Sequence, residues 1–150
     1  MSTKVTPYIV VPDCNAAIEF YQKAFGAEET SARILDENNR VGHAMFDIGE
    51  STIHISDEHP ELDILAPGTI GNSPVRLMLQ VDDVDTTFKL ALDLGAKELI
   101  PVADQFYGER SGRLMDPSGH TWILSTTIED LSDDELSERA SGKYHVEEAE

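Results

Sequence analysis

The chain carries the same order of apolar patterns twice. Strand-like apolar runs at 6–13 and at 76–83 each contain a Val that is followed by a turn with Asp. Each run precedes a segment whose apolar side chains recur at helical spacing. These side chains are Ile18, Tyr21 and Phe25 in the first half, and Val84, Phe88, Ala91 and Leu92 in the second. Both segments end at Gly-Ala, at 26–27 and 95–96, where a helix C-terminus favours a residue that tolerates positive φ. The two halves are therefore predicted to fold alike.

Short strands are predicted after each helix. Their ranges are about 29–35, 41–48 and 51–56 in the first half, and about 97–102, 111–115 and 120–126 in the second. The fold class is therefore α+β, with two tandem βαβββ modules at about 4–58 and 73–127. A linker with Pro and Gly joins them at 59–72, and an acidic tail occupies 128–150. We expect all of residues 1–150 to form a single domain.

The charge balance narrows the class of partner. The 150 residues include 29 Asp and Glu against 11 Lys and Arg, a net charge of −18. Binding to nucleic acid or to an anionic membrane needs a basic surface, so neither partner is expected. A single cysteine, Cys14, excludes an internal disulfide, and we expect it to be a buried thiol. Residues 1–4 lead directly into a short apolar run rather than a signal peptide, which predicts a cytoplasmic protein.

The acidic tail shows a helix signal of its own. Ser132 and Glu135 have the spacing of a capping box, which predicts a short C-terminal helix through about Ala140. Nine acids and two bases lie in 128–150, and runs of like charge are usually solvated. We therefore expect the tail to be a solvated appendage outside any binding site.

Three stretches carry a resemblance to a known family. They are 17–27, which ends at the first Gly-Ala, 107–113, and 116–122, which begins with Asp-Pro-Ser-Gly-His. Together with the repeat, they resemble the vicinal-oxygen-chelate superfamily of glyoxalases, bleomycin-resistance proteins and dioxygenases, and most of all its PhnB-like group. The resemblance covers about 4–140. It implies sheets that curl around a shared cleft, usually in a homodimer.

The resemblance also implies where a metal would bind. The family's ligand positions fall on Thr6, His54, Arg76 and Ile123. Among these, His54 alone is a usual ligand, since Arg76 is a permanent cation without a lone pair. A catalytic metal site normally needs about three protein ligands. No cofactor is therefore expected, and a divalent metal held by relocated ligands is the alternative.

Strand alternation gives a separate view of the cleft, because alternate residues share a face. The residues predicted to face it are Thr6, Tyr8 and Val10; His43, Met45 and Asp47; Thr52, His54 and Ser56; and Arg76, Met78 and Gln80. His43 and His54 would face each other across a hairpin, as a shifted metal site, as an acid–base pair, or as structural hydrogen-bonding groups. Trp122 is predicted to pack on the opposite, helix-covered side.

A loop at 106–110 interleaves aromatic and charged residues at the predicted mouth of the cleft. Arg76, Arg110 and Arg113 would concentrate positive charge there for a carboxylate or phosphate ligand. Internal salt bridging of Arg110, for example with Glu109 or Asp116, is the alternative. The predicted ligand-binding group is Tyr8, His54, Arg76, Gln80, Tyr107 and Arg110.

Three functions are consistent with these patterns. The favoured one is metal-independent binding of a small, anionic molecule in the cleft of a homodimer. The second is an enzyme that uses His43 and His54, as metal ligands or as acid and base. The third is a protein that sequesters cationic antibiotics, which fits the net charge but not the three arginines.

Overall fold

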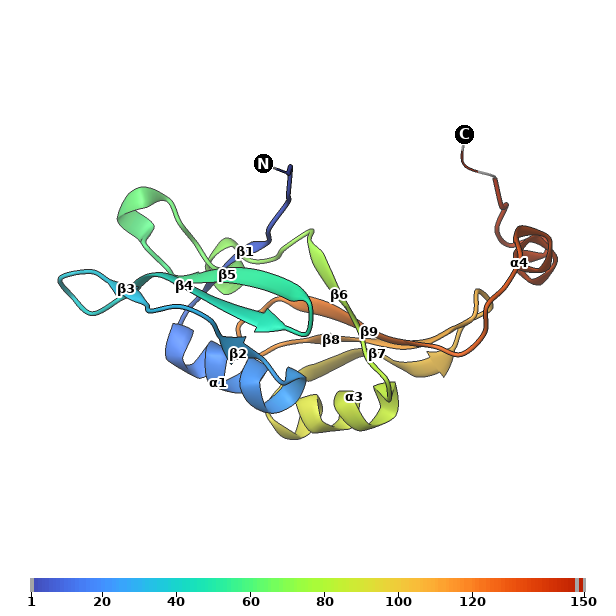
Figure 1. Ribbon diagram of the computed structural model, residues 1–150, viewed down its shortest axis with the longest axis horizontal. Coiled ribbons are helices and arrows are strands. Elements are labelled where there is room, and N and C mark those ends of the chain that lie inside the picture. The colour runs from blue at the N-terminus through green and yellow to red at the C-terminus, as the bar shows by residue number, and fades with distance from the viewer. Residues whose placement is uncertain (1, 148, 150) are drawn as a thin grey trace.

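The computed structural model describes residues 2–147 and 149, and it contains two βαβββ modules (Figure 1). The first module consists of β1 (Tyr8–Val11), α1 (Cys14–Phe25), β2 (Glu28–Glu29), β3 (Ile34–Leu35), β4 (Val41–Ile48) and β5 (Ser51–Asp57). The second consists of β6 (Arg76–Gln80), α3 (Val84–Asp93), β7 (Lys97–Asp104), β8 (Glu109–Met115) and β9 (Thr121–Thr127). The linker holds a 3-10 turn, η1 (Pro60–Leu62), and α2 (Pro67–Ile70), and α4 (Asp133–Ala140) follows the second module.

The two sheets have the same topology. Their strand orders are β1-β5-β4-β2, with β3 also on β4, and β6-β9-β8-β7. In each sheet the first strand runs parallel to the last, and the other pairs are antiparallel. The predicted α+β fold of two βαβββ modules is therefore confirmed. Within the described residues the two sheets remain separate and open rather than hydrogen-bonded into one.

The helices of both modules begin and end as the repeated signals predict. Side chains of Asp13 and Asp83 accept the backbone N–H three residues later, which satisfies a free donor at the start of α1 and of α3. Gly26 ends α1 with φ 71°, in the left-handed region. Figure 1 shows α1 and α3 next to each other on one side of the sheets, and the two helices are in contact.

One apolar core joins both modules. Burial alternates along β4, where Ala44, Phe46 and Ile48 are buried and the residues between them are half-buried. Trp122 of the second sheet is buried as predicted, and its ring lies 5.6 Å from that of Tyr21 in α1. Each fully buried side chain of this size stabilises the fold by about 1.5–3 kcal/mol, so the modules fold around shared side chains.

A buried carboxylate reinforces this junction. Asp116 Oδ2 accepts from the Tyr21 hydroxyl at 2.5 Å and from Trp122 Nε1 at 2.8 Å. Its Oδ1 accepts the backbone N–H groups of Ser118 at 2.9 Å and His120 at 3.0 Å. Asp116 therefore connects the first helix to the Asp-Pro-Ser-Gly turn of the second module.

The structure departs from the predicted strands in one region. The strand expected at 29–35 is broken into the two short strands β2 and β3. Arg33 turns back between them and donates from Nε to Glu29 Oε1 at 2.7 Å, and it also bonds to Asn15 of α1. These side-chain bonds tie the segment between β2 and β3 to α1, while β2 and β3 each pair separately with β4.

Most described side chains of the tail are exposed, as expected, but the tail also contacts the body of the protein. The capping box of Ser132 and Glu135 is present, and α4 ends at Ala140 as predicted. However, Ala140 is only 4% exposed. The ring of Tyr144 stacks on that of Phe106 with centroids 5.2 Å apart. The tail is therefore docked against the loop between β7 and β8.

Candidate functional site

A group of three rings lies on the open face of the first sheet, opposite the helices. Tyr8 comes from β1, His43 from β4 and His54 from β5. His43 Nε2 lies 3.2 Å from His54 Nδ1, and the Tyr8 ring lies 5.9 and 5.6 Å from the rings of His43 and His54. The structure thus brings together two of the predicted ligand-binding residues and the second candidate histidine.

Strand register explains this grouping. Parallel pairing of β1 with β5 sets Tyr8 beside His54, and antiparallel pairing of β4 with β5 sets Met45 opposite His54. His43, two residues earlier on the same face, is therefore the diagonal neighbour of His54 rather than its direct partner. Diagonal neighbours remain within reach of ring side chains, which is why the two imidazoles meet.

The hydrogen bonds of the ring group leave polar atoms for a ligand. The bond between the histidines uses one nitrogen of each ring and leaves His43 Nδ1 and His54 Nε2. The Tyr8 hydroxyl donates to the Gly42 carbonyl at 3.1 Å. Partial burial is the largest cause that raises the pKa of this phenol, so Tyr8 stays protonated and acts as a donor. The site therefore presents the two remaining ring nitrogens beside Tyr8, which is 51% exposed.

The open face of the second sheet carries a different set of polar groups. Burial alternates along β6, with Arg76, Met78 and Gln80 exposed, as strand alternation predicts. Gln80 Nε2 donates to Thr127 Oγ1 at 2.6 Å, and Thr127 Oγ1 donates to Glu109 Oε1 at 3.1 Å.

Glu109 is a residue of this face that sequence reasoning missed. Its Oε2 accepts from the buried Ser125 hydroxyl at 2.6 Å. The sequence suggests it only as an ion-pair partner of Arg110. The signal that could have found it is alternation along β8, which puts Glu109 on the same face as Ser111 and Arg113.

Arg110 lies on the other side of this sheet from the predicted cleft. Its Nε and Nη2 bind the Asp85 carboxylate of α3 at 2.9 and 3.0 Å, and its Nη1 binds Asp104 Oδ1 at 2.9 Å. Arg110 lies on the same face of β8 as Gly112. This face is covered by α3, since a Cβ added at Gly112 would lie 2.9 Å from the Phe88 ring. Arg110 therefore forms ion pairs within the chain, as the alternative predicted, although its partners are Asp85 and Asp104.

Tyr107, another predicted ligand-binding residue, lies in the loop before β8 and is half-exposed.

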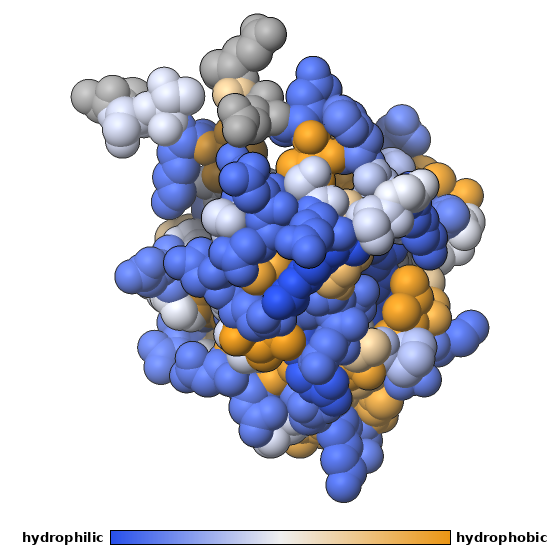
Figure 2. All heavy atoms as spheres, turned by 90° about the vertical axis from the view of Figure 1, so that its right-hand side faces the viewer, coloured by the Kyte–Doolittle hydropathy of each residue, from blue (hydrophilic) through white to orange (hydrophobic). Residues whose placement is uncertain are grey.

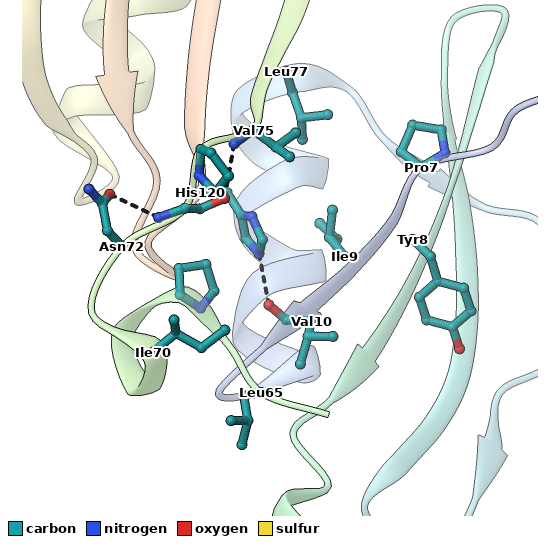
Figure 3. Close-up of a pocket in the computed structure, with 13 residues that line it drawn as sticks. Pro7, Tyr8, Ile9, Val10, Leu65, Ile70, Asn72, Val75, Leu77 and His120 are labelled. Atoms are coloured by element: carbon teal, nitrogen blue, oxygen red, sulfur yellow. Dashed lines mark hydrogen bonds between the residues drawn. The ribbon is translucent and has the colours of Figure 1, made fainter. Parts of the chain in front are cut away.

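A largely apolar hollow of about 440 Å³ lies where the two modules meet, between β1, the linker and β6. Figure 3 shows Ile9, Leu77 and His120 around it, with the Tyr8 ring turned away from His120. His120 Nε2 lies 2.7 Å from the Val10 carbonyl oxygen and so joins the modules. Tyr8 is among the lining residues, whereas His54 and Arg76 are not. The predicted ligand-binding residues therefore do not all line this hollow.

The side chains at the family's metal positions do not fit a metal centre. Thr6 offers a hydroxyl, Arg76 a cation and Ile123 an alkyl chain, which leaves His54 as the one usual ligand. Within 2–147 and 149, no group of three His, Cys, Asp or Glu side chains is placed to hold an ion.

Cys14 is buried at the start of α1. Burial, with a smaller contribution from the Asp57 carboxylate, raises the pKa of its thiol from 9.0 to about 12. The thiolate fraction near neutral pH is therefore lower by roughly 1,000-fold than that of a free thiol.

We expect the thiol reagent DTNB to leave Cys14 of the native protein unmodified while it reacts fully with the chain in urea. Fast, stoichiometric reaction of the native protein would contradict this placement.

Comparison with known proteins defines the family. The chain matches the Glyoxalase/Bleomycin resistance protein/Dioxygenase superfamily over residues 4–124. It is 34% identical over 142 residues to the uncharacterized protein Mb0911c of Mycobacterium bovis, and the match covers 93% of each chain. The chain therefore belongs to the glyoxalase, bleomycin-resistance and dioxygenase superfamily.

Solved structures share this fold. The gene product AT5G48480 of Arabidopsis thaliana is 26% identical with a TM-score of 0.66, and the match covers 83% of this chain and 99% of that one. The fosfomycin resistance protein FosX of Listeria monocytogenes is 19% identical with a TM-score of 0.64, over 91% of this chain and 98% of that one.

Among the described residues, no helix has the length and apolar character needed to cross a bilayer.

Proposed function

We propose that the protein binds a small organic anion in a cleft shared by two copies of the chain, as a PhnB-like member of its superfamily. One wall of the cleft is the ring group of Tyr8, His43 and His54. The other is the open face of the second sheet of the partner copy, with Arg76 and Gln80. Binding uses the side chains of these two faces and no metal.

The observation that carries the proposal is the ring group itself. Three ring side chains from three strands converge on a sheet face that is open to solvent, and His43 and His54 hold each other at 3.2 Å. Fixed ring orientations reduce the entropy lost when a ligand binds. Because each imidazole keeps one further nitrogen, the group can direct hydrogen bonds outward.

The charges of the two faces support an anionic ligand. The bond between the histidines uses the N–H of one ring, and the accepting ring keeps an N–H on its other nitrogen that can donate to a ligand. Arg76 contributes a permanent cation with a planar set of donors that matches a carboxylate or phosphate. The nearby carboxylate of Glu109 accepts from Ser125 and Thr127, which offsets part of its charge.

The exposed surfaces support a second copy. Met78, on the edge strand β6 of the second open face, is 62% exposed, and Tyr8 is also exposed. Within the described part of the chain, β1 pairs only with β5 and β6 only with β9, so each sheet keeps an unpaired edge. Exposed apolar side chains beside free strand edges favour association with another chain.

Two measurements on the purified protein test this function. Light scattering after size-exclusion chromatography should give the mass of two chains. In ¹H–¹⁵N NMR, a panel of small carboxylates and phosphate monoesters should include members that shift the ring signals of His43 and His54 saturably. A monomer, a panel without effect on these signals, or uptake of cationic glycopeptides in place of anions would contradict the proposal.

A further inference from the structure

The docked tail and the loop before β8 enclose a second hollow at the end of the second sheet, of about 490 Å³. Its walls include three aromatic side chains and three cations: Phe106, Tyr107 and Tyr144, and Arg113, Arg139 and Lys143. It is therefore built from two segments that are separate in the sequence, the aromatic loop at 106–110 and the acidic tail.

Backbone contacts hold the start of the tail against the loop. The Ile128 and Glu129 N–H groups donate to the Gly108 carbonyl at 2.9 and 3.1 Å. Gly108 has φ 90°, and a Cβ there would lie 2.6 Å from the Glu129 carbonyl oxygen. Such a close approach is open to glycine alone. The entry of the tail is thus positioned by main-chain atoms.

Side chains hold the other end of the tail. Both guanidinium Nη atoms of Arg139 bind the Glu129 carboxylate at 2.7 Å, a bidentate pair that ties α4 to the start of the tail. Tyr144 stacks on Phe106, and the Tyr107 ring meets Phe106 in a T-shaped arrangement with centroids 5.2 Å apart, so the three rings form a continuous aromatic wall.

The charge inside this hollow is opposite to that of the protein. Among the described residues that line the hollow there is no carboxylate, although the whole chain has 29 acids and 11 bases. Arg139 is paired with Glu129, whereas Arg113 and Lys143 make no ion pair within residues 2–147 and 149. Figure 2 shows this end of the molecule as mainly hydrophilic, with small hydrophobic areas between polar side chains.

We propose that this hollow binds a small aromatic anion, with its charged group between Arg113 and Lys143 and its ring against the wall of Phe106 and Tyr144. An arginine and a lysine without carboxylate partners attract a carboxylate or phosphate, and an aromatic wall contributes contact with a flat apolar ring. The residues that line this hollow all belong to one chain. Because Arg113 also lies on the open face of the second sheet, Lys143 and His54 are the residues that separate this hollow from the shared cleft proposed above.

Titration of the full-length protein with benzoate, followed by ¹H–¹⁵N NMR, tests the proposal. Benzoate should shift the backbone signals of 105–107 and 139–144 saturably, and phenyl phosphate should do the same. Benzyl alcohol and benzylamine have the ring without the negative charge and should bind at least about 10-fold more weakly, since a charge-assisted hydrogen bond contributes about that factor or more. Equal binding of benzyl alcohol, or absence of benzoate binding at millimolar concentration, would overturn the proposal.

Variants separate this hollow from the shared cleft. Lys143→Gln and Arg113→Gln should each weaken benzoate binding by about 10-fold, whereas Lys89→Gln, on the exposed surface of α3, should leave it unchanged. Lys143 is exposed, so its substitution tests the pocket even if Arg113→Gln impairs folding. His54→Ala should also leave the shifts at 105–107 intact. If His54→Ala removes these shifts and Lys143→Gln does not, the anion binds in the shared cleft and this inference fails.

Discussion

Replacing Asp116 with Ala is expected to lower the free energy of unfolding by about 2–6 kcal/mol, because it leaves two buried donors without an acceptor at about 1–3 kcal/mol each. These donors are the Tyr21 hydroxyl at 2.5 Å and Trp122 Nε1 at 2.8 Å. The turn that follows loses two backbone hydrogen bonds as well. Urea denaturation followed by circular dichroism measures the change.

Matched variants identify the cause of this loss. Asp93→Ala removes an exposed carboxylate from the end of α3 and should change stability by less than about 0.5 kcal/mol. Tyr21→Phe removes one of the two buried donors, and it should be tolerated better than Asp116→Ala. If Asp116→Ala and Asp93→Ala unfold at the same urea concentration, Asp116 does not hold the modules together.

The second large effect concerns binding. His54→Ala is expected to weaken the binding of an organic anion by about 10- to 100-fold, since a hydrogen bond to a charged group contributes about 1.5–3 kcal/mol. It also removes the partner that orients His43. Arg76→Gln should weaken binding to a similar extent, because it removes the cation proposed for the opposite wall. Isothermal titration with the tightest-binding anion of the panel measures both.

Two control variants accompany this measurement. His145→Ala changes an exposed histidine of the tail, and Lys89→Gln removes an exposed positive charge from α3. Both should bind the anion as the unmodified protein does. A loss of affinity in Lys89→Gln as large as that in Arg76→Gln would show that overall charge, rather than a site at Arg76, governs binding.

Local signals explain why the repeat was predictable from the sequence. Helical spacing, Gly at helix ends and the Asp-Pro-Ser-Gly turn each act over a few residues, and they recur in both halves. The open faces of β4 and β6 also followed from alternation alone, which placed His43, Arg76 and Gln80 as the structure does.

Longer-range contacts explain what the sequence did not reveal. Arg110 was assigned to a loop because β8 was predicted to begin at residue 111. It begins at Glu109, which puts Arg110 on the helix-covered side, within reach of Asp85. Likewise, the composition of the tail predicts solvation, whereas the stack of Tyr144 on Phe106 depends on a partner far away in the sequence.

The central claim is that each cleft combines the first module of one copy with the second module of another. A direct test is to mix unfolded His54→Ala and Arg76→Gln chains in equal amounts and to refold them together, so that mixed dimers form. In a mixed dimer one cleft carries both substitutions and the other carries neither, so binding of the anion should return at one site in each mixed dimer. The account predicts this recovery of unmodified affinity in a quarter of all clefts when equal amounts of the two chains associate at random. No recovery on mixing would show that His54 and Arg76 serve one cleft within a single chain, or no common cleft, and would contradict the account.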